Sequence, residues 1–119
     1  MSLIDTTQIA LERAISGATV RQATLATNLA NANTPGYIAQ DVDFHTTLRS
    51  AMRNGTESAI ENAQFLPSSR GSGPIRADGN GVDPDAEAAK LSQAGLELNA
   101  LTRVAGARID ILRSAMGVR

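Results

Sequence analysis

The sequence has no cysteine or tryptophan and very few aromatic residues of any kind. Its 119 residues include one histidine and three aromatic side chains, Tyr37, Phe44 and Phe65. Without cysteine the chain has no disulfide and no thiolate metal site. Since aromatic side chains supply much of the buried area of a core, we expect one domain with a thin core. Its stability should then depend on packing against copies of itself or a partner.

The sequence also lacks a surplus of one charge and a long apolar run. Eleven basic and twelve acidic residues give a net charge of −1, and no basic cluster indicates binding to nucleic acid. No apolar run approaches the roughly 20 residues that cross a membrane, so we expect a chain that is not membrane-spanning. Residues 1–5 have neither the basic nor the apolar part of a cleaved signal peptide, so any export is expected to proceed without cleavage.

The sequence contains no strong motif of catalysis or cofactor binding. His45 is the only histidine, and no nucleophile elbow is present. The glycine pairs at 71–73 and 79–81 are not followed by the Gly-Lys-Ser/Thr of a phosphate-binding loop. The Asp-x-Asp pairs at 41–43 and 83–85 are more typical of turns and helix starts than of catalytic dyads or metal sites. We therefore expect no enzyme activity, cofactor, metal or small-molecule substrate.

The first third of the chain has the periodicity of a helix. Asp5 and Gln8 have the spacing of a capping box, and apolar side chains recur every seven residues, some with a companion four residues later. We expect one N-terminal helix within residues 1–33, about 42 Å long at 1.5 Å per residue. Its apolar face comprises Ile4, Leu11, Ile15, Ala18, Leu25, Leu29 and Ala32.

The last third has the same character. Asp83 can cap a helix, Pro84 suits its first position, and Asp85 suits the positive end of the helix dipole. Gly117 is a suitable terminator. We expect one C-terminal helix within residues 84–119. Its apolar face comprises Leu91, Ala94, Leu98, Leu101, Ala105, Ile109, Leu112 and Met116.

Between these helices, residues 34–83 show no sustained period and no convincing strand. Residues 67–84 hold three of the four prolines and four of the ten glycines, and a loop this long is uncommon in a compact domain unless it is functional or disordered. Residues 44–53 fit one short helix. The expected fold is all-α, with two long terminal helices in an antiparallel, coiled-coil-like hairpin and a largely irregular or disordered central region. Periodicity alone fits a simple helical domain as well as an assembly subunit.

The segment 25–37, Leu-Ala-Thr-Asn-Leu-Ala-Asn-Ala-Asn-Thr-Pro-Gly-Tyr, combines a helix stop with a run of asparagines. The proline disfavours helical geometry in the residue before it, and Pro-Gly suits a type II turn. Asparagine side chains can bind the loosened backbone at a helix end. A simple helix stop explains the proline and glycine but not the asparagines. The signature residues are Asn28, Asn31, Asn33, Thr34, Pro35, Gly36 and Tyr37.

This segment resembles the N-terminal signature of the flagellar axial proteins, which include rod, hook and hook-associated subunits. The short chain favours a rod subunit, since hook and distal-rod subunits carry large inserted domains. Residues 41–44, Asp-Val-Asp-Phe, and residues 79–91 resemble segments of proximal rod subunits. Ala94 and Leu98 stand where those subunits usually have asparagine and tyrosine, so a second short rod protein stays open as an alternative.

The resemblance implies a structural subunit of the flagellar basal-body rod in the periplasmic space. It implies export by the flagellar type III apparatus and polymerisation through the terminal helices. The implied partners are copies of the chain, adjacent rod proteins, and components of the membrane ring and export apparatus. A soluble helical adaptor or export chaperone is the alternative from another class. The implied assembly residues are Leu11, Ile15, Leu25, Leu29, Leu91, Leu98, Leu101, Ile109 and Leu112.

Phe44 and Leu48 also resemble the Phe-x-x-x-hydrophobic export-gate motif of early flagellar substrates. The alternative is that the two side chains only pack one turn apart on a short helix.

Overall fold

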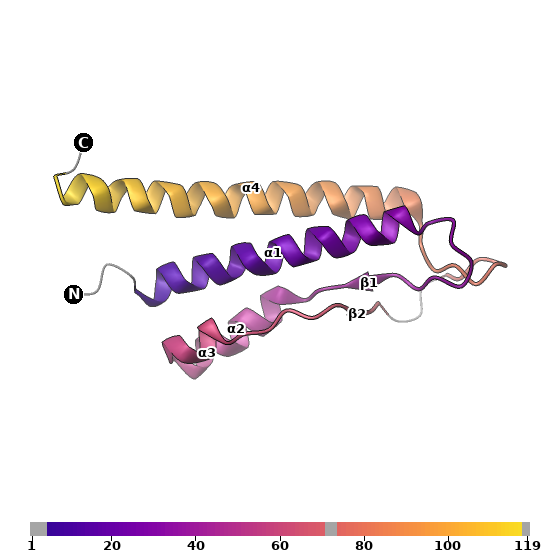
Figure 1. Cartoon of the computed structure of the whole chain (residues 1–119), viewed down its shortest axis with the longest axis horizontal. Coiled ribbons are helices and arrows are strands. Elements are labelled where there is room, and N and C mark those ends of the chain that lie inside the picture. The colour runs from indigo at the N-terminus through magenta and orange to yellow at the C-terminus, as the bar shows by residue number, and fades with distance from the viewer. Residues whose placement is uncertain (1–4, 71–73, 118–119) are drawn as a thin grey trace.

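A computed structural model describes residues 5–70 and 74–117. The molecule is elongated and thin, measuring 62 × 31 × 14 Å, and α1 lies between α4 and the central region (Figure 1). The elements of the described residues are α1 (Thr6–Ala30), β1 (Gln40–Asp41), α2 (Phe44–Asn54), α3 (Glu57–Glu61), β2 (Ser68–Ser69) and α4 (Pro84–Ala115).

The two long helices form the predicted antiparallel hairpin, in which α4 runs back along α1 (Figure 1). Both helices begin at the predicted caps. The Asp5 carboxylate accepts a hydrogen bond from the backbone N–H of Gln8 at 3.0 Å, and the Asp83 carboxylate accepts from the N–H groups of Asp85 and Ala86. Local chemistry therefore determines where each helix starts.

The central region is more ordered than the sequence indicates. The predicted short helix is present as α2, and a second short helix, α3, follows it. The expectation of no strand is wrong: β1 and β2 pair antiparallel, with Gln40 opposite Ser69 and Asp41 opposite Ser68. Two residues per strand give no alternation to detect in a sequence. The segments flanking β2 are irregular, as expected.

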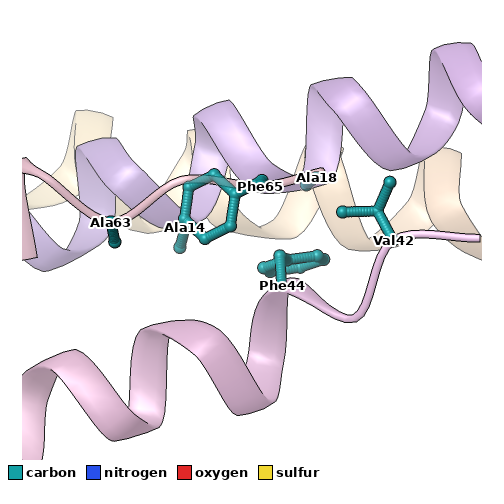
Figure 2. Packing of buried hydrophobic residues seen from close by; sticks show 6 residues of the cluster. All are labelled: Ala14, Ala18, Val42, Phe44, Ala63 and Phe65. Atoms are coloured by element: carbon teal, nitrogen blue, oxygen red, sulfur yellow. The ribbon is translucent and has the colours of Figure 1, made fainter. Parts of the chain in front are cut away.

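Phe44, at the start of α2, fills the main core between the central region and α1 (Figure 2). It is 1% exposed, and the ring of Phe65 meets its ring edge-on at a centroid distance of 6.2 Å. A Cβ at Gly17 would lie 2.7 Å from the Phe44 Cβ, so this approach needs glycine in the middle of α1. The cluster comprises Ala14, Ala18, Val42, Phe44, Ala63 and Phe65.

The core is thin in the way that the composition predicts. Eight of the fifteen buried apolar residues of the described chain are alanine. A buried methylene contributes about 0.8 kcal/mol, so alanine adds little compared with leucine or phenylalanine. The larger buried side chains, Leu25, Phe44 and Ile60, are spread along the molecule. We therefore still expect a marginally stable monomer.

Candidate functional site

Asn28, near the end of α1, is fully buried and joins three elements. Its Oδ1 accepts hydrogen bonds from the Tyr37 hydroxyl and from the N–H of Gln40, each at 3.0 Å. Its Nδ2 donates to the carbonyl of Gln40 at 2.7 Å and to Oε2 of Glu87 at 3.0 Å. Both donors and both acceptor sites are used. The asparagine that a helix stop leaves unexplained therefore connects α1, β1 and α4.

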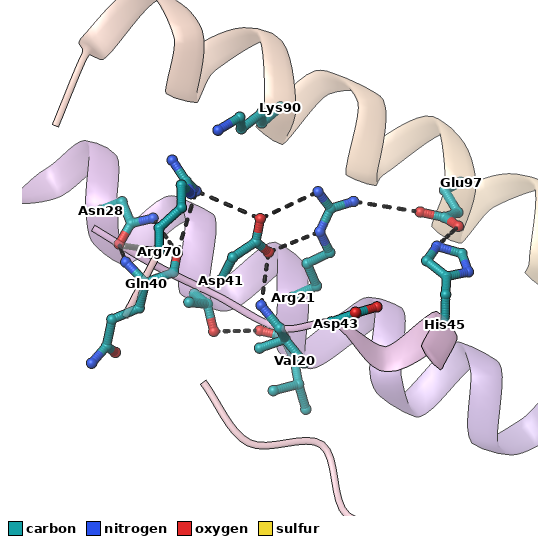
Figure 3. Close-up of polar contacts among 12 residues, drawn as sticks. Val20, Arg21, Asn28, Gln40, Asp41, Asp43, His45, Arg70, Lys90 and Glu97 are labelled. Carbon is teal, nitrogen blue, oxygen red and sulfur yellow. Dashed lines mark hydrogen bonds and ion pairs between the residues drawn. The ribbon is translucent and has the colours of Figure 1, made fainter. Parts of the chain in front are cut away.

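Glu87, in the first turn of α4, is the charged member of this arrangement. Its side chain is 1% exposed, and the guanidinium of Arg70 contacts Oε1 while Nη2 lies 3.3 Å from Oε2. Burial by itself raises the pKa of Glu87, but the hydrogen bonds from Arg70 and Asn28 outweigh it and hold the pKa below its ordinary value. The carboxylate therefore stays ionised at neutral pH. We call Asn28, Tyr37, Gln40, Arg70 and Glu87 the Asn28 clamp (Figure 3 shows three of them).

Asn80, in the loop that precedes α4, connects this loop to the residues that follow α1. It is fully buried, and its Nδ2 donates to the carbonyls of Asn31 and Thr34 at 2.9 and 2.7 Å. The guanidinium of Arg76 donates to the carbonyl of Ala32. Side chains of the loop thus bind backbone carbonyls of the residues that directly follow α1. We call Asn80, Asn31, Thr34, Arg76 and Ala32 the Asn80 lock.

Backbone contacts complete the joint between this loop and the predicted Pro-Gly turn. Gly36 donates its N–H to the carbonyl of Asp78 at 3.0 Å, and Gly81 donates to the carbonyl of Tyr37 at 2.8 Å. Gly79 has a φ of +81°, and a Cβ there would lie 3.3 Å from the Gly36 Cα. The close approach of the two backbones and the positive φ both favour glycine at this position.

The turn itself has the predicted geometry. Gly36 has a positive φ of 75°, and the N–H of Tyr37 donates to the carbonyl of Thr34 at 3.3 Å. Asn31, the residue that caps the end of α1, binds the last turn of the helix, since its Nδ2 donates to the carbonyl of Thr27 at 2.8 Å. Asn33 is exposed and has no side-chain hydrogen bond to another described residue. The structure therefore gives every signature residue except Asn33 a place in or beside the joint.

A second polar network lies between the centre of α1, β1 and α4 (Figure 3). Nε of Arg21 donates to Asp41 at 3.0 Å, and Nη1 lies 3.8 Å from Glu97. Burial raises the pKa of Asp41, but the hydrogen bond from Arg21 helps to hold it below its ordinary value. Glu97 also lies 2.7 Å from Nε2 of His45, whose side chain is 55% exposed.

This network borders an open groove of about 760 Å³, which Ser68 and Leu96 also line. No hydroxyl of the described residues hydrogen-bonds to His45, so the contact between the histidine and Glu97 lies at the surface without an adjacent nucleophile. No group of three metal-binding side chains occurs within residues 5–70 and 74–117. The groove therefore has charge but no constellation typical of catalysis.

Sequence reasoning missed the roles of Arg70, Arg76, Asn80 and Glu87. The family resemblance covers Asn80 and Glu87, yet nothing in their spacing shows that they meet Asn31 and Asn28 across 49 and 59 residues of chain. Arg70 and Arg76 lie in a segment without any period. The signal that could have found Asn80 is its position between two glycines, which is unusual for a simple loop residue.

The two residues of the suggested export motif lie where the simpler alternative places them. Phe44 is buried in the core, and Leu48 packs against the same cluster one turn later on α2. In the folded chain Phe44 is inaccessible to another protein. The export role stays a prediction that concerns the unfolded chain.

The predicted assembly residues occupy different environments. Leu25 is fully buried, whereas Ile109 is 44% exposed. Leu98 and Leu101 pack against the Phe44 cluster. The others, which are Leu11, Ile15, Leu29, Leu91 and Leu112, are half-buried.

The C-terminal helix α4 also has a second apolar side that the sequence reasoning missed. Leu96, Val104 and Ile111 are 72%, 54% and 68% exposed. Their spacing of eight and seven residues puts them on one side of the helix, and the exposed Ala100 and Ala107 fall between them. We call these five residues the outer stripe of α4. The series was overlooked because the stronger leucine series on the same helix accounts for the hairpin. No helix in the described part of the chain is long and apolar enough to cross a membrane.

Comparison with known proteins identifies the family. A family model described as "Flagella basal body rod protein" matches residues 8–37, which include Asn28 and the turn. The flagellar basal body rod protein FlgB of Escherichia coli (strain K12) is 30% identical over 115 residues, covering 79% of this chain and 83% of that protein. FlgB of Salmonella typhimurium is 31% identical over 106 residues, covering 75% and 77%. FlgB of Bacillus subtilis (strain 168) is 27% identical over 125 residues, covering 98% and 97%. The chain therefore belongs to the FlgB family of flagellar basal body rod proteins.

Proposed function

We propose that this chain, a structural subunit of the flagellar basal-body rod, polymerises through α1 and α4 to build the proximal part of the rod. The observation that carries the proposal is the outer stripe of α4. A helix that already buries one apolar side against α1 exposes a second one along its length, and such a surface marks a contact with another protein. Because the family is structural, we infer no catalytic role.

The hairpin explains how one small chain can serve as a building block. The Asn28 clamp and the Asn80 lock fix the relative positions of α1, the turn and the start of α4. The outer stripe differs from the other exposed surfaces of the subunit, so its contact with a second copy is not made by the same patch on both molecules. Heterologous contacts generate a filament when the rotation between successive copies does not close a ring.

Export without cleavage through the flagellar type III apparatus is the second part of the proposal. A thin, alanine-rich core without cysteine supports it, because such a chain unfolds at low cost before transit. After transit the subunit would fold against adjacent rod proteins and components of the membrane ring. Its place would be the periplasmic space, at the base of the rod.

Assembly is tested with purified chain over a range of concentrations, by sedimentation velocity and electron microscopy. We expect rod-like polymers above a critical concentration, and a several-fold higher critical concentration for Leu96→Ser. Thr102→Ser, on the same helix, is the matched control and should assemble normally. A chain that stays monomeric at every concentration, alone and with adjacent rod proteins, would overturn the proposal.

Motility gives the corresponding test in the source bacterium. Proline in the interior of a helix costs about 3 kcal/mol or more, so Ala105→Pro should break α4 and abolish swimming. Cells that swim normally with α4 broken would show that this helix is not needed in the rod.

Export is tested separately with two buried aromatic residues of one cluster. Phe44→Ala and Phe65→Ala remove rings that contact each other, but only the first residue belongs to the suggested gate motif. We expect secretion of the Phe44 variant to fall while the Phe65 variant is secreted like the natural chain. Equal secretion of the two variants would leave Phe44 with a packing role alone.

A further inference from the structure

The two ends of the molecule expose surfaces of different shape and charge. We call residues 74–85, which comprise the loop before α4 and the first two residues of α4, the 74–85 loop; it lies at one end of the molecule and projects beyond α4, and the last turns of α4 lie at the other end (Figure 1). Since the molecule is 62 Å long, the two surfaces cannot meet within one copy. Each is therefore free to contact a neighbouring molecule.

The loop is a preformed projection. The Asn80 lock ties it to the end of α1, and the positive φ of Gly79 sets its bend. Although the loop is held from inside, it exposes Ile75 by 60%. A loop held from inside in this way loses little conformational entropy when a partner covers its exposed side chain. The loop therefore has the form of a contact element that is ready to bind.

The charge of the loop is mainly negative. Residues 74–85 contain three carboxylates, Asp78, Asp83 and Asp85, against the single guanidinium of Arg76. That guanidinium already donates to the carbonyl of Ala32 and has Nε 3.8 Å from Asp78. The exposed tip thus combines one large apolar side chain with an excess of negative charge.

The far end of α4 has the complementary character. Val104 and Ile111 are 54% and 68% exposed. Of the three guanidinium groups in residues 103–117, that of Arg108 contacts Asp5 and that of Arg113 lies 3.5 Å from Asp110, whereas Arg103 has no ion pair with another described residue. Arg103 is exposed directly beside Val104. An apolar stripe with positive charge along it matches an apolar tip with negative charge around it.

We propose that copies of this chain contact one another head to tail, with the 74–85 loop of one copy seated on Val104 and Ile111 of the next. This inference rests on the proposed function and names the partner of the outer stripe in its C-terminal half. The two surfaces differ and lie at opposite ends, so the contact is heterologous and extends into a linear array. Charge pairs at its edge set the register and speed the encounter.

Cross-linking tests the contact directly, because the natural chain has no cysteine. The double variant Ile75→Cys/Ile111→Cys, assembled above the critical concentration and then oxidised, should give a ladder of disulfide-linked oligomers. The control, Thr19→Cys/Ile111→Cys, places one cysteine on the exposed side of α1 and should give no ladder. A ladder from the control, with none from the first variant, would overturn the head-to-tail contact and leave assembly through the helices standing. Failure of the natural chain to assemble would instead overturn the proposed function.

Charge reversal gives a second, independent measurement. Arg103→Glu should raise the critical concentration several-fold and weaken its dependence on salt, since salt screens exposed charge pairs. Arg53→Glu reverses an exposed charge on α2 and should leave both quantities unchanged. Equal effects of the two reversals on the critical concentration and on its salt dependence would overturn the proposed role of charge at this contact.

Discussion

The loop end and the terminal end of this molecule are held together by different interactions. At the loop end, Asn28, Asn80 and Glu87 are buried polar groups whose hydrogen bonds are satisfied by segments far apart in the chain. At the terminal end, α4 packs on α1 through a few half-buried apolar side chains and exposes others. Buried polar groups demand one geometry, because any other leaves them unpaired. The comparison teaches that one end fixes the shape of the subunit and the other remains available to neighbours.

Among the variants of buried polar groups, the largest effect on the subunit should come from Asn28→Ala, which breaks the loop end of the comparison. It removes four hydrogen bonds, including the one that the backbone N–H of Gln40 donates and one of those that the buried carboxylate of Glu87 accepts. Because each unsatisfied buried group costs about 1–3 kcal/mol, we expect the free energy of unfolding to fall by about 3 kcal/mol in urea denaturation. Asn33→Ala is the matched control, since Asn33 is exposed, and should change it by less than about 0.5 kcal/mol. Similar losses in the two variants would contradict the clamp.

Two glycine substitutions should act in opposite directions on α1 and α4. Gly17→Ala forces a Cβ against Phe44, and overpacking of this kind costs about 1–3 kcal/mol. Gly106→Ala meets no atom within 4 Å and should stabilise α4 by up to about 1 kcal/mol, because alanine favours the helix. Thermal unfolding followed by circular dichroism measures both. A more stable Gly17→Ala variant would show that Phe44 does not pack closely on α1.

The pH dependence of stability isolates the charged part of the clamp. The pKa of Glu87 in the folded chain lies below the ordinary value of 4.5, so ionised Glu87 stabilises the fold above pH 4.5. That contribution is lost as the pH falls through the folded pKa, with a slope of up to about 1.4 kcal/mol per pH unit. Glu87→Gln should be less stable at pH 7 and should lose less stability between pH 5 and 3, in urea titrations at each pH. If the free energy of unfolding of Glu87→Gln changed with pH as steeply as that of the natural chain, Glu87 would not be a source of the pH dependence. Asp41 contributes to the pH dependence in both proteins.

The smallest effect on the isolated subunit is expected at the terminal end. Ile111→Ser changes a side chain that is 68% exposed, so the free energy of unfolding should change by less than about 0.5 kcal/mol. Leu25→Ala, in a fully buried position of α1, should cost about 2–5 kcal/mol. Assembly should respond although stability does not: Ile111→Ser should raise the critical concentration. If Ile111→Ser destabilised the dilute monomer as much as Leu25→Ala does, that result would show that the Ile111 side of α4 is buried within the subunit.

The sequence by itself determined the two long helices, their caps and the turn. Asp5, Asp83 and Pro84 act within one helical turn, and Pro35 and Gly36 act through their own backbone preferences, so no distant residue is needed. The apolar periods that include Leu25 and Leu98 likewise predict which sides of the helices meet, since apolar residues that recur with the period of a helix lie on one face of it. The family signature was also legible, because it is a continuous run of residues.

Only the tertiary structure decided what the asparagines do and how the central region packs. Asn28 meets Glu87 and Asn80 meets Asn31 from positions about half a chain apart, and no local preference encodes such a pairing. The strand pair and the fit of Phe44 over Gly17 also depend on chain segments that approach only after folding. The outer stripe of α4 became visible for the same reason. Which apolar side of a helix stays exposed depends on how the rest of the chain packs against it, so only the folded structure reveals it.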